Sequence, residues 1–298
     1  MPVPARARWA VLGASGQIGH FLIGRLRDAG EPALALSRRA PEHGLQRDTI
    51  HWLRGDLDSA MPALACERLV SAGPLDACAR WLAGPSAPES CRALVAFSST
   101  SLESKAESTD SAERALAARL GRAEAELSDA CARRGIALLL LRPTLIYGCG
   151  LDRNLTRLAQ AARRLGVLPL PRSSGGLRQP VHADDLAALA LSAEPVPGVR
   201  SFALAGGETL AFRDMAARVL ACLDERPRLV MLPDVVFGAL NGALRVLRPH
   251  AALAPTQVRR LAEDLVFDDT PARRTLGWRP RGFLPQSGMF VPPARGGP

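Results

Sequence analysis

Three glycines near the start of the chain have the spacing of a phosphate-binding turn. Gly13, Gly16 and Gly19 follow the apolar run 9–12, and in the segment 18–26 an aliphatic residue recurs every fourth position. This order predicts a strand, a turn and an amphipathic helix. There the first glycine can take a positive φ, the second lets a pyrophosphate approach, and the third lets the helix pack closely on the strand. Because N–H groups of a first helical turn attract phosphates, the pattern predicts a dinucleotide site.

The end of the second predicted strand favours one form of the dinucleotide. The segment 32–36 predicts this strand, and Ser37, Arg38 and Arg39 follow it. At this place a carboxylate binds the ribose 2′-hydroxyl of NAD, whereas an arginine accommodates the 2′-phosphate of NADP. No acidic residue is present, and serine and arginine can bind a phosphate. The sequence therefore favours NADP over NAD.

Two later strand ends are expected to complete the cofactor site. The predicted strand over 49–53 is followed by the acidic-apolar pair Asp56-Leu57. The predicted strand that begins at residue 68 leads into the small residues 71–73. The carboxylate can accept a hydrogen bond from the adenine amino group, although it could equally cap a helix. The expected cofactor contacts up to this point are Gly13, Ser15, Gly16, Gln17, Ile18, Gly19, Ser37, Arg38, Arg39, Asp56, Leu57, Ser71, Ala72 and Gly73.

Strands and helices continue to alternate as far as Tyr147. The segment 93–97 predicts a fifth strand, and Asp110 predicts the start of a long helix that stops at Gly135. The unbroken apolar run 136–141 is typical of a parallel strand buried on both faces. Six strands phased in this way predict an α/β protein with a doubly wound parallel sheet, the Rossmann fold.

The regular alternation of predicted strands and helices ends near residue 150. We expect 1–150 to form the NAD(P)-binding domain and 151–298 a smaller C-terminal substrate region, with part of 178–205 returning to the first domain. The segment 168–176 is rich in proline and glycine, which predicts a loop that could reach over a ligand. The helix predicted over 235–246 is apolar on most faces, so we expect it to pack against the body or a second subunit.

Charge and composition limit the class of partner. The chain has 298 residues, a formal net charge of +9 and an isoelectric point near 10.4. Lys105 is the only lysine, and the arginines are spread along the chain without interleaved aromatic residues. A nucleic-acid surface would concentrate both. We therefore expect no nucleic-acid partner, a small-molecule substrate and affinity for anionic ligands.

Cysteine spacing and hydropathy indicate a compartment. The six cysteines are scattered, with neither a C-x-x-C pair nor metal-ligand spacing, which suits a reducing environment and predicts no metal site. No window approaches the roughly 18 uninterrupted apolar residues of a spanning helix, and the start of the chain has no apolar signal core. We expect a cytoplasmic protein with no membrane span.

Six short motifs occur over nearly the whole chain. They are Gly13-x-x-Gly16-x-x-Gly19, Asp56-Leu57, Phe97-Ser98-Ser99-Thr100, Leu141-Arg142-Pro143-x-x-x-Tyr147-Gly148, Val181-His182-Ala183-Asp184-Asp185-Leu186 and Leu276-Gly277-Trp278-Arg279-Pro280. In this order they resemble the extended short-chain dehydrogenases/reductases of the NAD-dependent epimerase/dehydratase group. The resemblance implies a Rossmann domain that carries NAD(P), with Pro143 among the cofactor contacts, and a C-terminal region that closes over the substrate.

The resemblance also implies a catalytic arrangement from which this chain departs. In the family a hydroxyl residue after the fifth strand positions the substrate, which here is Ser99 or Thr100 depending on how the motif is counted. A Tyr-x-x-x-Lys pair on the next helix transfers the proton and holds the nicotinamide ribose. Alignment of 123–126 with the residues after the lysine places Ala118 at the tyrosine position and Arg122 at the lysine position. The acid/base tyrosine is absent, and Arg122 is expected to hold a ribose hydroxyl.

Other groups that could titrate are not expected to replace the tyrosine. Tyr147, the only tyrosine, follows the sixth strand and is expected to be a structural or pocket residue. Lys105 lies in a polar segment and is expected to be solvated. His182 belongs to a motif that is mainly architectural in the family, in which an aspartate, here Asp184 or Asp185, bonds backbone N–H groups at a helix start.

Two functions from different classes remain open at this level. The first is an atypical NADP-dependent oxidoreductase or epimerase/dehydratase-like enzyme acting on a carbonyl or hydroxyl carbon. The second is a non-catalytic NADP(H)-binding sensor or scaffold, which Ala118 favours and the hydroxyl residues oppose. A DNA-binding regulator would need a concentrated basic face. A homodimer through the helix that carries Leu116, Leu120 and Leu127 is also expected.

Overall fold

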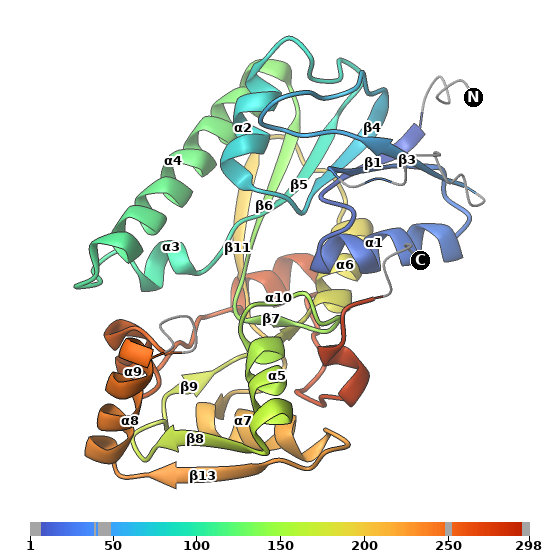
Figure 1. The fold of residues 1–298 in the computed structure, drawn as a ribbon. Coiled ribbons are helices and arrows are strands. Elements are labelled where there is room, and N and C mark those ends of the chain that lie inside the picture. The colour runs from blue at the N-terminus through green and yellow to red at the C-terminus, as the bar shows by residue number, and fades with distance from the viewer. Residues whose placement is uncertain (1–6, 39, 41–48, 248–251, 294–298) are drawn as a thin grey trace.

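A seven-stranded parallel sheet forms the centre of the part of the chain that the structure, a computed structural model, describes: residues 7–38, 40, 49–247 and 252–293 (Figure 1). Its strands are β1 (Ala7–Leu12), β2 (Ala33–Ser37), β3 (Ile50–Arg54), β4 (Cys66–Ser71), β5 (Ala93–Phe97), β6 (Ala137–Pro143) and β11 (Val199–Leu204). The order is β11-β6-β5-β4-β1-β2-β3, and every neighbouring pair is parallel. The predicted Rossmann fold is confirmed, with β11 added at the edge.

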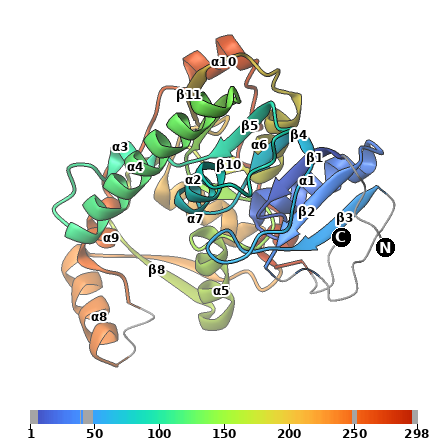
Figure 2. The same cartoon turned by 90° about the horizontal axis from the view of Figure 1, so that it is seen from above.

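Helices cover both faces of this sheet (Figure 2). On one face α2 (Leu75–Ala83) packs against α4 (Ser111–Arg134), and on the other α1 (Gln17–Asp28) packs against α6 (Ala183–Ser192). Because strand side chains alternate between faces, each strand contributes to two separate cores.

The strand β6 shows why its sequence is apolar without interruption. Leu138 and Leu140 belong to the core that includes residues of α2 and α4, whereas Leu139 and Leu141 belong to the core that includes residues of α1 and α6. All four side chains are buried. A strand with helices on both sides has no solvent face, so no polar alternation remains.

The long helix α4 begins and ends where its sequence predicts. The side chain of Asp110 accepts a hydrogen bond from the backbone N–H of Ala112 at 2.8 Å, and Gly135 ends the helix with a φ of 65°. These are ordinary N-terminal and C-terminal caps. Part of the expected dimer face on this helix is not available to a second chain, because Leu127 is fully buried in the core with α2.

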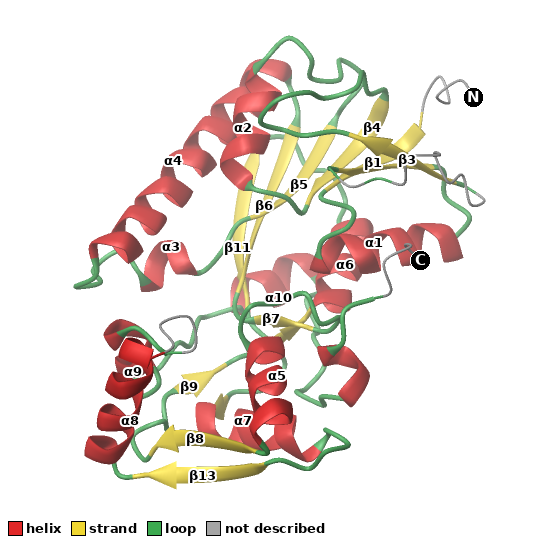
Figure 3. Ribbon diagram, in the orientation of Figure 1, coloured by secondary structure: helices red, strands yellow, loops and turns green. Residues whose placement is uncertain are grey.

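The C-terminal half builds a smaller α/β region below the sheet (Figure 3). Its apolar core includes Leu155, Met215, Phe283 and Phe290. Its strands and those that join it to the sheet are β7 (Ile146–Tyr147), β8 (Val167–Pro171), β9 (Leu177–Arg178), β10 (Val181–His182), β12 (Leu210–Ala211) and β13 (Arg228–Leu232). The remaining helices are α3 (Ser101–Ser104), α5 (Leu155–Leu165), α7 (Phe212–Ala221), α8 (Asp234–Leu247), α9 (Pro255–Arg260), α10 (Thr270–Leu276) and η1 (Ser287–Phe290).

The predicted proline-rich loop is wrong in its first half. Residues 167–171 form β8, which pairs in parallel with β13, and the irregular turn begins at Arg172. Pro169 and Pro171 are compatible with a strand because β8 has one partner in the described sheet, so a proline nitrogen can face the unpaired edge.

The body of the protein, one of the two packing partners predicted for the apolar C-terminal helix, covers little of it. Phe237 is the only residue of α8 that is buried, and most of its aliphatic side chains face solvent. An apolar sequence predicts that the helix is covered, but it does not specify whether the same chain or another molecule covers it.

Candidate functional site

The first glycine of the turn occupies a position that no other residue could fill. Gly13 has a φ of +74°, and a Cβ atom on it would lie 2.8 Å from the backbone nitrogen of Gly73 and 2.9 Å from the carbonyl oxygen of Ala72. Left-handed backbone and contacts this short exclude a side chain. The turn after β1 therefore lies directly against the turn after β4.

The other two glycines bring the helix start onto this turn. The N–H of Gly16 donates to the carbonyl of Gly13 at 2.8 Å, and a Cβ on Gly19 would lie 2.2 Å from that same oxygen. Gly16 caps α1 without a side chain, and the first turn of the helix carries no acidic residue. The N–H groups of Gln17 and Ile18 in this first helical turn can face an anion, so the turn fits a dinucleotide pyrophosphate.

The end of β2 lies beside the same turn. The hydroxyl oxygens of Ser15 and Ser37 are 2.7 Å apart, and the N–H of Ala14 donates to the carbonyl of Leu36 at 3.0 Å. Arg38 follows in an exposed turn. Arg39, which we also expect to contact the cofactor, lies outside the described residues.

The residues after β3 form a self-contained turn. The N–H of Asp58 donates to the carboxylate of Asp56 at 3.2 Å, and backbone bonds join Asp56 to Ala60 in both directions. One carboxylate oxygen of Asp56 thus stabilises its own turn. This resembles the second of the two roles predicted for Asp56, which is to cap backbone N–H groups and not to bind adenine. The side chain of Leu57 lies 3.6 Å from the place of a Cβ on Gly73, so the turns after β3 and β4 meet.

Two of the hydroxyls after β5 are engaged in local structure. Thr100 is buried and donates through Oγ1 to the carbonyl of Pro143 at 3.2 Å, while its N–H donates to the same oxygen. The hydroxyl of Ser99 accepts from the N–H of Ser101, the first residue of the short helix α3, at 3.1 Å. These bonds leave Ser99 its hydroxyl proton for a ligand, whereas Thr100 directs its proton into the backbone.

Ser98 is a site residue that the sequence did not single out as such. Its Oγ is buried and has no hydrogen-bond partner within the protein. A buried hydroxyl left unpaired costs free energy, so this hydroxyl at a pocket wall is a candidate for a hydrogen bond to a ligand. Its place as the first hydroxyl after Phe97, at the carboxyl end of β5, was a signal that could have identified it.

A pocket of about 220 Å³ opens between α2 and α4 at this sheet edge. It is lined by Gly73, Pro74, Leu75, Asp76, Phe97, Ser98, Arg119, Leu120 and Ala123. Gly73 lines this pocket and lies against Gly13 of the glycine turn, so the pocket adjoins the turn.

The helix α4 presents a different set of residues to the pocket than its sequence alignment suggests. Arg119 and Leu120 line the pocket, whereas Arg122 and Ala118 are exposed and do not. Arg119, Leu120 and Ala123 are spaced by about one helical turn and share a face. The described part of α4 therefore brings neither a tyrosine nor a lysine to the pocket.

Tyr147 and His182 lie in the core, away from this pocket. The two rings meet edge to face at 5.0 Å, and Tyr147 packs at the same distance against Phe283. Burial raises the pKa of Tyr147 to about 12, and burial also lowers the pKa of His182. Both rings pack against other core side chains and neither lines the pocket, which is the placement expected of structural residues.

The acidic pair after His182 ties three segments together and does not cap its own helix. His182 Nδ1 accepts from the N–H of Asp184 at 3.1 Å, so the histidine is the cap of α6. The Asp184 carboxylate accepts two bonds from Arg25 of α1 and one from Arg281. Asp185 accepts from the side chain and the N–H of Arg281. An aspartate at this helix start thus bonds a backbone N–H as expected, but the N–H is that of Arg281 and His182 caps the helix.

Contrary to expectation, Lys105 is not solvated. It belongs to a group of ion pairs, Lys105, Glu113 and Arg260, that joins the sheet region to the smaller C-terminal region and is called the bridge below. Its Nζ lies 3.1 Å from the carboxylate of Glu113, which also pairs with Arg260 of α9 at 3.3 Å. Arg260 donates in addition to the carbonyl of Ser104 at 2.6 Å. Although burial alone would raise it, the hydrogen bond from Ser108 and the two cations hold the pKa of Glu113 below its usual value.

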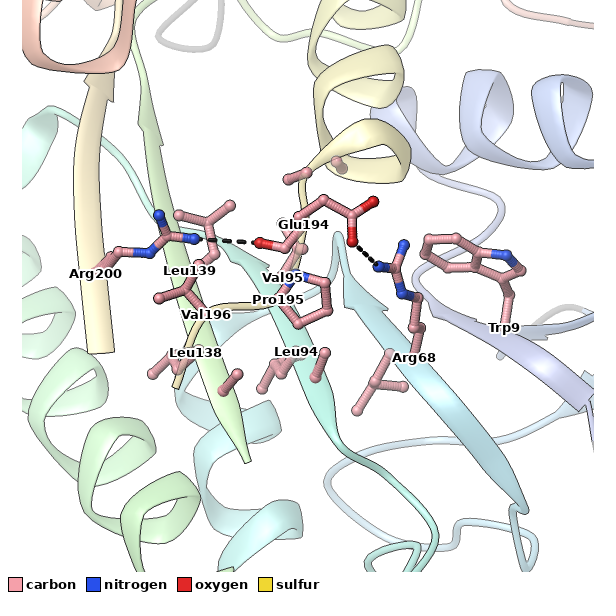
Figure 4. Close-up of a pocket in the computed structure, with 15 residues that line it drawn as sticks. Trp9, Arg68, Leu94, Val95, Leu138, Leu139, Glu194, Pro195, Val196 and Arg200 are labelled. Carbon is pink, nitrogen blue, oxygen red and sulfur yellow. Dashed lines mark hydrogen bonds and ion pairs between the residues drawn. The ribbon is translucent and has the colours of Figure 1, made fainter. Parts of the chain in front are cut away.

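A second, small pocket lies near the amino-terminal ends of the strands, beside the end of α6 (Figure 4). Glu194 forms its polar wall, pairing with Arg68 at 3.2 Å and accepting from Arg200 through its backbone carbonyl at 3.2 Å. Leu94 and Leu138, near the amino ends of their strands, line it as well. Open α/β sheets bind ligands at the carboxyl ends, so this pocket is separate from the candidate site.

Comparison with known proteins gives one similar sequence and many similar folds. No family model matches the chain. A ceramide reductase of Caulobacter vibrioides (strain NA1000 / CB15N) is 26% identical over 264 residues, which cover 82% of this chain and 80% of that protein.

The solved structures that resemble the chain are much more distant in sequence. MoeE5 in complex with UDP-glucose and NAD has a TM-score of 0.66 at 18% identity, covering 93% of this chain and 94% of its own. A UDP-galactose 4-epimerase has a TM-score of 0.67 at 15% identity, with 95% and 97% covered. WbmF of Bordetella bronchiseptica in complex with NAD+ and UDP has a TM-score of 0.65 at 15% identity, with 96% and 90% covered. These likenesses establish a shared Rossmann-type fold over nearly the whole chain.

Proposed function

We propose that the protein is an NADP(H)-dependent reductase of the short-chain dehydrogenase/reductase type that acts on a carbonyl group of a lipid. The glycine turn joined to the pocket of Ser98 carries this proposal, because it combines a dinucleotide cradle with a polar group at one sheet edge. The ceramide reductase that is 26% identical over four-fifths of both chains supports the reaction and the substrate class.

The cofactor would lie across the carboxyl ends of the strands. The turn from Gly13 to Gly19 would hold the pyrophosphate, Leu57 would cover the adenine, and Ser71, Ala72 and Gly73 would lie beneath the nicotinamide half. When bound, the nicotinamide supplies the hydride. Two features fit such a ligand: the glycine turn, where a Cβ on Gly13 or Gly19 would clash with the backbone, and the unpaired hydroxyl of Ser98.

Ser98 and Arg119 are the polar groups best placed to act on a substrate carbonyl. The unpartnered Ser98 hydroxyl can donate a hydrogen bond to the carbonyl oxygen, and the guanidinium of Arg119 can stabilise negative charge that develops there. An arginine keeps its proton, so water would supply the proton in place of a tyrosine. A positioned acid contributes roughly 10²–10⁴-fold, and we expect a correspondingly slow enzyme.

The apolar part of the pocket suits a long-chain substrate. Leu75, Phe97, Leu120 and Ala123 supply carbon atoms on the walls around Ser98. A sugar nucleotide would need several polar partners to satisfy its hydroxyls, because each unpaired buried group is costly. The pocket also has polar groups on Asp76, Ser98 and Arg119, so the proposal of a lipid over a sugar nucleotide rests on the similarity to the ceramide reductase.

The preference for NADP follows from the end of β2. Ser37 lies beside Ser15 of the glycine turn, and Arg38 follows at the strand end, where no carboxylate occurs in the sequence. Of the solved structures compared above, MoeE5 and WbmF were determined with NAD, and that cofactor belongs to those proteins. Here we propose that Arg38 binds the 2′-phosphate.

A titration with NADPH and NADH tests the cofactor. Loss of a charged hydrogen bond worth about 1.5–3 kcal/mol should weaken NADPH binding by Arg38→Asp roughly 10–100-fold. NADH binding should be kept or become tighter, because the new carboxylate can bind the ribose 2′-hydroxyl of NADH. Arg228→Asp, at an exposed arginine on β13, should affect neither nucleotide. Equal losses for both nucleotides, or no binding of either, would refute the NADP proposal.

The absence of a tyrosine facing the pocket favours one alternative, a non-catalytic NADP(H)-binding protein. Turnover of a ceramide-type ketone by the wild type, compared with Ser98→Ala, separates the two. NADPH binding without oxidation in the presence of the ketone would support the alternative. NADPH oxidation that Ser98→Ala slows at unchanged NADPH affinity supports the reductase.

A further inference from the structure

One side of α8 exposes aliphatic side chains that the described part of the chain leaves uncovered. Val235 and Val246 are 85% and 83% exposed, and Val236, Leu240 and Leu247 are exposed as well. They make up more than a third of the large hydrophobic residues that are exposed among the described residues. Such a concentration on one helix indicates a binding surface.

The exposed residues form one continuous stripe. At about 100° per residue, the five aliphatic residues fall within an arc of roughly 140°, and Ala239 and Ala243 lie between them. The two charged residues of the helix, Asp234 and Arg245, lie together outside this arc. The stripe therefore carries no charge from the helix itself.

The body of the protein holds α8 so that this stripe points outward. Phe237 is buried, the N–H of Ser173 donates to Asp234 at 3.1 Å, and the amide of Asn241 exchanges two 2.9 Å bonds with the backbone of Leu253. These contacts lie on the side opposite the stripe. Figure 2 shows α8 at the periphery, apart from the central sheet and α4.

The length and surroundings of α8 fit a lipid surface. A helix of 14 residues is about 21 Å long, less than the roughly 30 Å of a bilayer core, and no helix of the described residues could cross a membrane. Arg245 is exposed on the polar side of the helix, and exposed Arg172 lies beside its start, where its N–H donates to the carbonyl of Leu232. A helix with an apolar face and basic residues on its polar side binds at the interface of anionic lipids.

We propose that the aliphatic stripe of α8 docks this protein on an anionic lipid bilayer. A dimer through the same face would bring together two chains that each carry a net charge of +9, which disfavours a second copy. The choice of a lipid surface over a protein partner rests in part on the proposed lipid substrate. Docking there would hold the smaller region at the surface from which such a substrate enters.

Vesicle sedimentation of the full-length protein tests the docking. We expect binding to vesicles of phosphatidylcholine with phosphatidylglycerol, weaker binding to phosphatidylcholine alone, and weakening by added salt. Val235→Asp with Val246→Asp should reduce binding roughly tenfold per site. Leu165→Asp, an exposed apolar residue on α5 at the other end of β13, is the matched control and should bind as the wild type.

Several outcomes would overturn the docking. They are no vesicle binding, equal loss in the control, or a wild-type dimer that the α8 variant converts to monomers without any vesicle binding. Unchanged melting temperatures would show that the variants are folded. NADPH titration of the same preparations separates the proposals: vesicle binding without NADPH binding refutes only the reductase, and NADPH-dependent reduction without vesicle binding refutes only the docking.

Discussion

Replacement of Glu124 by alanine should destabilise the protein strongly, because it breaks a buried ion pair beneath the candidate site. Glu124 of α4 is 7% exposed, and its two carboxylate oxygens accept bonds of 2.9 and 2.5 Å from Arg142 of β6. This pairing raises the pKa of Arg142. The pair fixes α4, which carries Arg119 and Leu120, against the strand that ends at Pro143.

The expected loss is about 3 kcal/mol. Removal of one partner from a buried pair costs about 3–5 kcal/mol. The lower end applies here because the Arg142 side chain is 22% exposed and keeps a second contact, with Glu103 at 3.3 Å. For 298 residues at about 2.1 cal/mol/K each, the unfolding entropy is roughly 0.6 kcal/mol/K, so Tm should fall by about 5 °C.

A double-mutant cycle measures the pair itself. Glu124→Leu and Arg142→Met should each destabilise, and the double variant should lose less than the sum, because neither charge is then left alone in the interior. Urea and thermal unfolding give the free energies. Additive losses, or a loss below about 1 kcal/mol for Glu124→Ala, would refute the assignment of a buried, coupled pair.

Two further predictions concern the glycine turn and the bridge between the regions. Gly19→Ala should weaken NADPH binding at least roughly tenfold, because its Cβ would displace the carbonyl of Gly13. The stability that Glu113 contributes should be present above the ordinary pKa of a glutamate and be lost as the pH falls through its lower folded-state pKa. Thermal unfolding across acidic pH, compared with Glu113→Gln, measures this loss.

The chain offers a matched control for each. Gly24 lies on α1 like Gly19 but has open space around it, so Gly24→Ala should leave binding intact; equal effects of the two substitutions would contradict the steric argument. Glu126 is exposed on α4, and Glu126→Gln should keep the wild-type pH profile. If Glu113→Gln also keeps that profile, the bridge does not supply the acid sensitivity.

The sheet and the glycine turn follow from the sequence because they depend on short segments. The run 136–141 requires burial on both sides, and the spacing of Gly13, Gly16 and Gly19 requires a close approach of strand, turn and helix. Asp110 and Gly135 mark the ends of α4 through bonds to their own neighbours. Each signal lies within one element, so no knowledge of distant contacts is needed.

The tertiary structure decided which side chains meet. Periodicity on α4 does not say whether Arg119 or Arg122 faces the pocket, because that depends on how the helix rolls against α2 and β6. Lys105, Glu113 and Arg260 form a bridge across about 150 residues of chain, and a composition-based expectation of a solvated lysine could not detect it. The outward stripe on α8 is likewise a property of the assembled fold, since an apolar helix in sequence alone looks like a buried one.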